Sequence, residues 1–254
     1  MFNHKKNTYL EINSAKIYYE DIGLKEKEVL LLLHGGFGNI EDLNEIADSF
    51  SKKYRILAID SRGHGASTLG NEGLSYKLLE EDVYDILNYL GINKVSIIGF
   101  SDGGIIALRM ASSKKINIEK MALIGTSSSK NDIEEISKIL DSITFEKAKM
   151  IFESEYELYE QINKEPNFEQ FTKEVVTMWK DKSQSGHPDT SVENITCDTL
   201  LIRGDNDFLV SLTSQAQLQK KIANCSLLNV PFCSHAVYKE DYKTVSFALE
   251  KFFK

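Results

Sequence analysis

The sequence predicts an α/β fold, in which a mostly parallel sheet is flanked by helices. Short, uniformly apolar runs, typical of strands buried on both faces, alternate along the chain with longer segments of helical periodicity. Strands that alternate with helices form parallel sheets with right-handed crossovers. The chain has 254 residues, of which 42% are hydrophobic, and this is enough for one such domain with an inserted subdomain.

The first half of the chain shows the alternation most clearly. A strand is expected to begin near residues 8–9, and residues 16–22 alternate apolar and polar side chains as an antiparallel strand does. The uniformly apolar runs, which predict buried strands, lie at residues 29–33, 55–59, 95–98 and 121–124. Apolar residues at helical spacing predict helices at residues 40–50, 76–90 and 103–112.

The composition and the hydrophobic pattern of the sequence change after residue 129. Residues 130–184 are rich in Glu and Lys, poor in Gly, and contain no apolar run that predicts a buried strand. Ile133, Ile136 and Leu140 keep helical spacing, so this segment predicts an all-helical insertion. The alternation then resumes with strands at 199–203 and 226–230 and helices at 212–222 and 242–253. The predicted core is therefore formed by residues 1–129 and 185–254.

The most informative motif is Gly99-Phe100-Ser101-Asp102-Gly103. It is a G-x-S-x-G string between a buried strand and a helix, the context in which a serine is exposed on a sharp, strained turn. Glycines on either side of the turn avoid collisions there, and Gly104 lets the helix approach the sheet. Ser101 is thus the candidate nucleophile for acyl transfer through a covalent ester.

A serine nucleophile needs a base, and the base needs a group that orients it. Of the five histidines, His235 follows the last strand and precedes the last helix, at the same sheet edge as Ser101. His4 is expected in a frayed terminus, His34 and His64 in Gly-rich loops with structural roles, and His187 beside Pro188 at the end of the insertion. Asp205 and Asp207 both follow the preceding strand, and we favour Asp207 because its loop position lets it reach the imidazole.

Buried N–H donors must meet the oxyanion of the tetrahedral intermediate. One is expected from Asp102, which follows the nucleophile at the start of a helix, and the second from the Gly-rich loop after the strand at 29–33. In that loop we favour the N–H of Gly36, with Phe37 next. The loop spacing is not G-x-G-x-x-G, which argues against a dinucleotide site.

With these motifs in this order, the chain resembles the α/β-hydrolase superfamily over nearly its whole length. The resemblance rests on His34-Gly35-Gly36, Asp60-x-Arg62-Gly63-His64-Gly65-x-Ser67, Gly99-x-Ser101-x-Gly103, Gly204-x-x-Asp207 and Ser234-His235. It implies an eight-stranded, mostly parallel sheet, a helical cap at residues 130–184, and a catalytic triad of Ser101, Asp207 and His235. It also implies no metal and no organic cofactor. Arg62 and His64 are expected to brace the loops around the site.

The substrate pocket is expected to involve Phe37, Phe100, Asp102 and Trp179. Phe37 and Phe100 flank the oxyanion loop and the nucleophile, whereas Trp179, Met178, Phe152 and Phe168 are expected mainly in the core of the cap. The Gly-x-Ser-Asp-Gly-Gly string is similar to that of biphenyl-hydrolase-like and aminoacyl-ester hydrolases. One hypothesis is therefore that Asp102 binds a cationic group, such as the ammonium of an aminoacyl ester. The alternative is a favourable charge at a helix N-terminus.

The composition and net charge of the chain argue against nucleic-acid and membrane partners. A net charge of -8 and isolated Lys pairs do not form a basic nucleic-acid footprint. The longest apolar run is far too short to span a membrane, and the first ten residues are polar without a signal core. Three cysteines without a C-x-x-C pair indicate a reducing compartment, so we expect a cytoplasmic protein. The oligomeric state is left open.

The leading hypothesis is a serine hydrolase that acts on a small organic ester or lactone through an acyl-enzyme. A cofactor-free C–C hydrolase or lyase with the same residues is one alternative, because pocket shape separates these activities. A non-catalytic ligand receptor on the same fold is the other, because fold does not fix function. Burst release of a chromophore from an activated ester distinguishes the enzyme from the receptor.

Overall fold

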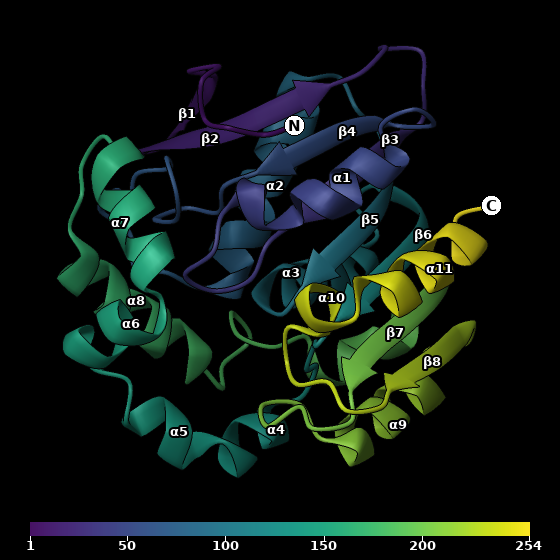
Figure 1. The fold of residues 1–254 in the computed structure, drawn as a ribbon. Coiled ribbons are helices and arrows are strands. Elements are labelled where there is room, and N and C mark those ends of the chain that lie inside the picture. Colours follow the sequence, from purple (N-terminus) through teal and green to yellow (C-terminus); the bar gives the residue numbers. More distant parts are fainter.

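A computed structural model describes residues 1–254 and contains one eight-stranded sheet (Figure 1). The strand order is β1-β2-β4-β3-β5-β6-β7-β8. β1 and β2 pair antiparallel, β2 pairs antiparallel with β4, and every other neighbouring pair is parallel. The predicted eight-stranded, mostly parallel sheet is therefore confirmed. The strands are β1 (Tyr9–Ile12), β2 (Ala15–Ile22), β3 (Val29–Leu33), β4 (Arg55–Ile59), β5 (Lys94–Phe100), β6 (Asn117–Ile124), β7 (Asp198–Gly204) and β8 (Cys225–Val230).

Helices cover both faces of the sheet, as the apolar strands require. On one face, Leu31 and Leu33 pack in the hydrophobic cluster to which helices α2 and α3 contribute. On the other, Leu30 and Leu32 pack in the cluster that includes residues of α1 and α11. These helices and their neighbours are η1 (Ile40–Leu43), α1 (Asn44–Phe50), α2 (Tyr76–Tyr89), α3 (Asp102–Ser113), η2 (Asp189–Asn194), α9 (Leu212–Lys221), α10 (Val237–Glu240) and α11 (Tyr242–Phe252). Alternate side chains of one strand thus build two separate cores.

The structure differs from the expected elements in three places. The helix expected at 40–50 is divided into η1 and α1, because Asn39 and Asp42 form a capping box that begins a 3₁₀ turn before the α-helix. The short elements η2 and α10 have no counterpart in the prediction. Both are too short to produce a periodic pattern.

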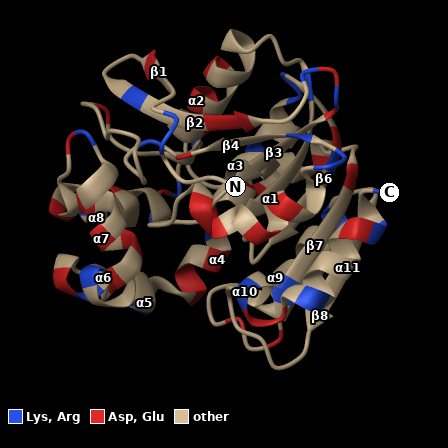
Figure 2. Cartoon of the chain, turned by 45° about the horizontal axis from the view of Figure 1, so that its top comes forward, with Lys and Arg blue, Asp and Glu red and all other residues tan.

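Five α-helices follow β6 and precede η2 and β7, in the segment where the all-helical insertion was expected (Figure 1). They are α4 (Lys130–Glu135), α5 (Ser137–Asp141), α6 (Phe145–Ile151), α7 (Glu153–Ile162) and α8 (Phe168–Trp179). Side chains of Ser129, Thr144 and Asn167 cap three of their N-termini. Figure 2 shows Asp and Glu residues, coloured red, along α7 and α8. Residues 130–184 are called the helical insertion below.

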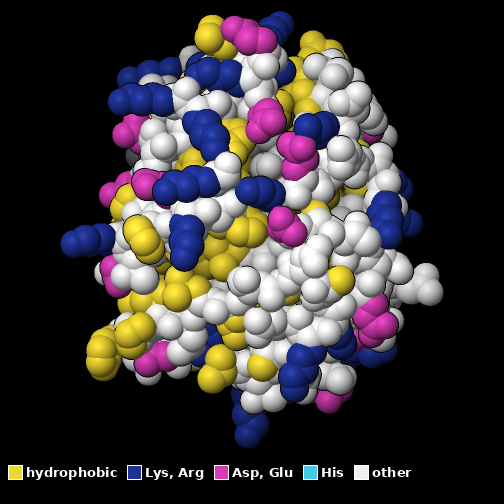
Figure 3. Space-filling view, turned by 90° about the vertical axis from the view of Figure 1, so that its right-hand side faces the viewer, with side chains coloured by type: hydrophobic (Ala, Val, Ile, Leu, Met, Phe, Trp, Pro, Cys, Tyr) yellow, Lys and Arg dark blue, Asp and Glu magenta, His cyan; other side chains and the backbone are white.

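β8 forms one edge of the sheet, next to β7. Figure 3 shows the side of the molecule on which the C terminus and β8 lie, and hydrophobic side chains gather there among Lys and Arg side chains. None of the helices combines the length and the apolar character that crossing a bilayer requires.

Candidate active site

Ser101 occupies the sharp turn between β5 and α3. Its backbone has φ 50° and ψ -115°, a strained conformation for a residue with a side chain. The helix that follows approaches the sheet closely, since a Cβ on Gly103 would collide with the carbonyl of Leu33 and a Cβ on Gly104 with the hydroxyl of Thr126. The glycines therefore allow the strand and helix to hold the serine hydroxyl above the sheet edge.

The structure brings Ser101, His235 and Asp207 together. The Nε2 atom of His235 lies 3.1 Å from Ser101 Oγ, and its Nδ1 atom lies 3.0 Å from Asp207 Oδ2. The three residues come from three loops that follow β5, β7 and β8, and these strands are parallel. Their carboxyl ends therefore meet at one sheet edge, where the loops place the hydroxyl, the imidazole and the carboxylate in a line.

Asp207 is the carboxylate that contacts the imidazole, and Asp205 is exposed to solvent. Burial alone raises the pKa of Asp207, but hydrogen bonds from His235 and from the N–H groups of Leu209 and Val210 outweigh it, so the pKa lies below its ordinary value. The carboxylate therefore remains ionised and faces the Nδ1 side of the ring. Of the two aspartates considered from the sequence, the favoured one, Asp207, is thus the one in contact with the ring.

Several backbone donors near Ser101 have no acceptor within the protein. Among them are the N–H groups of Gly36 and Phe37, in the loop after β3, and of Asp102, the first residue of α3. The first N–H groups of a helix lack intrahelical partners, so the N–H of Asp102 is free for an external acceptor. A Cβ on Gly35 would lie 3.2 Å from Ser101 Cβ, which places this loop against the nucleophile.

The side chain of Asp102 is buried and accepts two hydrogen bonds. Its Oδ1 accepts from Tyr76 Oη at 2.7 Å, and its Oδ2 accepts from Trp179 Nε1 at 2.8 Å. Burial raises the pKa of Asp102, and these two donors only partly oppose the rise. Asp102 thus joins the nucleophile helix to α2 and to α8 of the helical insertion. Both carboxylate oxygens already have partners before any substrate group arrives.

A cavity of about 410 Å³ opens onto Ser101 and His235. Thirteen of its 20 lining residues are hydrophobic. The helical insertion supplies a largely aliphatic wall: Ile133, Ile136, Ile139, Leu140, Ile143, Ile151 and Phe152. At one side lie Ser127 and His187, with 3.0 Å between Ser127 Oγ and His187 Nε2, and burial lowers the pKa of His187 to about 4. The lining is largely apolar, and the helical insertion adds one charged side chain to it, Lys147, whose ammonium donates to Ser142 Oγ at 2.7 Å.

Four residues were predicted to contact substrate, and the structure divides them. Asp102 and Trp179 line the cavity, whereas Phe37 and Phe100 do not. Phe37 is 3% exposed and packs in an aromatic cluster with Phe152 and Trp179, at centroid distances of 4.7 and 5.6 Å. Phe100 packs against Tyr238 and His235, at 4.9 and 5.2 Å.

The sequence analysis missed the aliphatic wall as part of the site. Ile133, Ile136 and Leu140 were recognised by their helical spacing but assigned only to helix packing. The available signal was that isoleucines recur at every third or fourth position from Ile133 to Ile143, in helices too short to bury them among themselves.

The other polar residues of the predicted motifs brace the loops. Ser61 N–H donates to His34 Nε2 at 3.0 Å, and buried His64 contacts the carbonyl of Arg62. Arg62 is fully buried and makes two hydrogen bonds, of 2.8 and 2.6 Å, to Asp82. No cluster of three or more His, Cys, Asp or Glu side chains is arranged to hold a metal ion.

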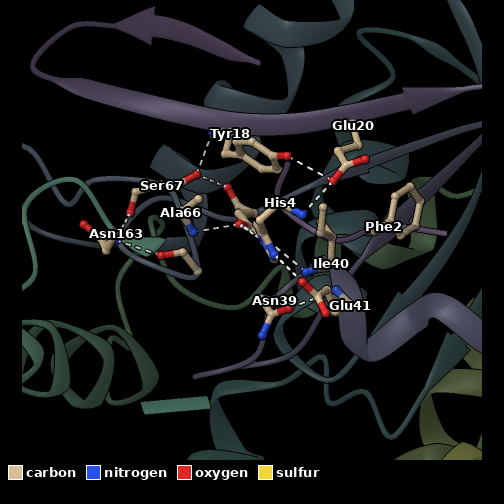
Figure 4. Close-up of polar contacts among 12 residues, drawn as sticks. Phe2, His4, Tyr18, Glu20, Asn39, Ile40, Glu41, Ala66, Ser67 and Asn163 are labelled. Carbon is tan, nitrogen blue, oxygen red and sulfur yellow. Dashed lines mark hydrogen bonds and ion pairs between the residues drawn. The ribbon is translucent and has the colours of Figure 1, made fainter. Parts of the chain in front are cut away.

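The expectation that His4 lies in a frayed terminus is wrong. Its imidazole is 2% exposed and lies between two carboxylates, with Nδ1 2.7 Å from Glu41 Oε1 and Nε2 2.8 Å from Asp60 Oδ2 (Figure 4). Phe2, two residues earlier, is buried in the hydrophobic cluster beside α1. The polar composition of the first residues concealed these contacts, because the partners lie far away in sequence.

Comparison with known proteins gives relatives of the same fold. The family described as the alpha/beta hydrolase fold matches residues 28–150. A putative esterase/lipase of Haemophilus influenzae is 39% identical over 99 residues, which are 39% of this chain and 34% of that protein. The matched region thus spans about one third of that relative. The serine hydrolase BPHL of Mus musculus is 27% identical over 208 residues, covering 78% of this chain and 69% of that protein.

A solved structure extends the likeness to the full length. The α/β hydrolase MGS-M2, from a Medee basin deep-sea metagenome library, superimposes with a TM-score of 0.78 at 21% identity, over 97% of both chains. At this identity the likeness concerns the fold. Together with the family match and the arrangement of β5, Ser101 and α3, it shows that the chain has the α/β-hydrolase fold.

Proposed function

We propose that the protein is a serine hydrolase that cleaves a small-molecule carboxylic ester or lactone through an acyl-enzyme. The observation that carries the proposal is the line of contacts from Ser101 Oγ through His235 to Asp207, at 3.1 and 3.0 Å, at the wall of an apolar cavity. These distances are those expected of a nucleophile, its general base and the group that orients the base.

In the proposed reaction, Ser101 Oγ attacks the carbonyl carbon of the substrate while His235 Nε2 takes the hydroxyl proton. Asp207 accepts a hydrogen bond from Nδ1–H and stabilises the imidazolium. Collapse of the tetrahedral intermediate breaks the bond to the leaving alcohol, which receives the proton from His235. A water molecule, deprotonated by His235, then attacks the acyl-enzyme and releases the carboxylic acid and free Ser101. No metal or organic cofactor enters this scheme.

The unpartnered N–H groups of Gly36 and Asp102 are the proposed oxyanion donors. Donors of this kind contribute mainly in the transition state, because the negative charge develops there. When it is ionised, the carboxylate of Asp102 lies near these donors and destabilises the negative charge of the oxyanion. Burial raises the pKa of Asp102, which makes its neutral form more accessible, and its two donors spread its charge when it is ionised.

The cavity favours an uncharged, aliphatic acyl or alcohol group. Its volume of about 410 Å³ lies in the lower part of the range of small-molecule pockets, which is about 300–1,000 Å³. The aliphatic wall offers no hydrogen bonds to a polar substituent. We therefore propose small to medium-sized substrates whose apolar part lies against the helical insertion, with the ester at Ser101.

A panel of p-nitrophenyl esters of increasing acyl length, lactones and aminoacyl esters tests the proposal. Each added methylene should raise kcat/KM by up to about fourfold until the cavity is full, since burying one methylene contributes about 0.8 kcal/mol. Ser101→Ala should abolish turnover. Ser112→Ala is the matched control, because Ser112 lies on the same helix and bonds only to the carbonyl of Leu108.

Two outcomes contradict the proposal. Turnover that survives Ser101→Ala excludes this serine as the nucleophile. A folded wild-type protein that hydrolyses no member of the panel, yet binds a ligand stoichiometrically, favours the receptor interpretation.

We also propose a reducing, cytoplasmic location, which the three free cysteines support.

A further inference from the structure

The loop that carries Gly36 is held at both ends by two consecutive residues, Asp60 and Ser61. At its start, the N–H of Ser61 donates to His34 Nε2 at 3.0 Å. At its end, the N–H of Ile40 donates to Asp60 Oδ1 at 2.9 Å. The position of the Gly36 N–H therefore depends on where this pair lies.

Asp60 is fully buried and bonds to more than the loop. Its Oδ2 accepts from the N–H of Ala66 at 2.8 Å and faces His4 Nε2 at the same distance (Figure 4). A Cβ on Gly65 would collide with the carboxyl group, so the carboxyl has no room to move toward that side. His4 is the only cationic side chain in hydrogen-bond contact with this buried carboxylate.

His4 contacts two carboxylates, one through each ring nitrogen. An imidazole donates from both nitrogens only when it is protonated, so two ionised carboxylates at these distances favour imidazolium. The backbone around it is also fixed: its N–H donates to Glu20 Oε1 at 3.0 Å, and the N–H of Phe2 donates to Asn44 Oδ1 at 2.8 Å. The N-terminal segment thus presents a positive charge to the interior.

We propose that His4 is a positioning residue for the oxyanion loop: its imidazolium holds Asp60, and Asp60 holds the end of the loop that carries the Gly36 N–H. The inference rests on the proposed function, because the loop matters to catalysis only if its N–H stabilises an oxyanion. No contact joins His4 to the substrate cavity, so its effect passes through Asp60 to Ile40 and through Glu41, which follows Ile40 in the chain.

The charge state of His4 gives the proposal a pH dependence. Burial opposes protonation of the ring, but hydrogen bonds and attraction from Asp60 and Glu41 outweigh it and raise the pKa of His4 to about 9. The other titratable groups around the cluster are Tyr9, Tyr18, Glu20 and Lys6. Burial raises the pKa of both tyrosines above its ordinary value, so they stay neutral when His4 loses its proton. Above about pH 9, neutral His4 donates to one carboxylate only, and the loop is less firmly held.

Three variants test this chain of contacts. His4→Gln removes the charge, and Lys5→Gln is its matched control, since Lys5 is exposed and its side chain contacts nothing. At pH 7, His4→Gln should lower kcat about tenfold or more and leave KM within about twofold, because oxyanion donors act in the transition state and complete loss of one costs about 100- to 1,000-fold. Lys5→Gln should change neither constant. Glu41→Gln keeps the contact with Asp60 but lowers the pKa of His4, so the alkaline fall in kcat should move to lower pH.

Fluorescence separates failure of this inference from failure of the proposed function. Trp179 is the single tryptophan, and a Cβ on Gly36 would touch its ring, so its emission reports on the oxyanion loop without any turnover. Wild-type emission should titrate near pH 9, earlier in Glu41→Gln, and not at all in His4→Gln. The inference is overturned if folded His4→Gln has the kcat of the wild type. It is also overturned if Glu41→Gln shifts neither the alkaline fall in kcat nor the pH at which the Trp179 emission changes.

Discussion

Asp207→Asn should lower kcat about 10,000-fold while leaving KM nearly unchanged. In the structure, Asp207 Oδ1 accepts the N–H groups of Leu209 and Val210 at 2.9 and 3.0 Å, and Oδ2 lies 3.0 Å from His235 Nδ1. An asparagine keeps its carbonyl oxygen on the two N–H groups, so its NH₂ faces Nδ1. His235 then carries its proton on Nε2, which points at Ser101 Oγ and can no longer accept the hydroxyl proton. The expected loss corresponds to about 5 kcal/mol of transition-state stabilisation.

The assay is steady-state hydrolysis of the best ester of the panel, with folding checked by circular dichroism. Asp205→Asn is the matched control in the same loop, and because Asp205 is exposed we expect kcat within about twofold of wild type. If Asp207→Asn retains more than a tenth of the wild-type kcat, or Asp205→Asn loses as much activity, the assignment of the orienting carboxylate is refuted.

Three further predictions concern the surroundings of the site. Asp102→Asn should change KM by the same factor for aminoacyl and neutral esters, because both of its oxygens already accept hydrogen bonds; a rise confined to aminoacyl esters would instead support ammonium recognition. Arg62→Met should lower the free energy of unfolding by about 3–5 kcal/mol, because it strands the buried carboxylate of Asp82, and chemical denaturation should show most of that loss restored in Arg62→Met/Asp82→Leu. Burial lowers the pKa of His64 to about 3 and that of His187 to about 4, so the unfolded chain takes up protons first and the free energy of unfolding should decline as pH falls from 6.5 toward 4. Denaturation curves that stay unchanged across that range, in wild type and in His187→Gln alike, would contradict the assigned burial.

Much of the fold followed from local patterns. The run at residues 29–33 is apolar throughout because β3 is buried on both faces, and its bounds in the structure are the predicted ones. The bounds of β4 also agree with the prediction. The split of the 40–50 helix could not be predicted from periodicity, because a capping box and one residue with φ -100° interrupt a pattern that remains continuous in the sequence.

Some parts of the candidate site also followed from local patterns, whereas others depended on contacts between distant residues. G-x-S-x-G marked Ser101 because the turn permits only small neighbours, which is a local requirement. The sequence favoured Asp207 over Asp205 from its place in the loop, but both follow β7, and only the path of the loop decides which carboxyl group faces the ring. The prediction that Phe37 lines the pocket rested on its place in the oxyanion loop. The aromatic cluster that covers its ring is formed by residues distant in sequence and could not be predicted.

By itself, then, the sequence predicted the alternation of strands and helices and the sharp turn at Ser101, because hydrophobic periodicity and turn sterics act over a few residues. The tertiary structure alone decided which distant groups meet. Ser101 and His235 are 134 residues apart and could be paired in advance only because each follows a parallel strand, whereas no pattern connects His4 with Asp60, 56 residues away. Such contacts depend on where parallel strands end and on which buried charge needs a partner. These are properties of the packed chain, since a charge requires a counterion only once folding has removed it from water.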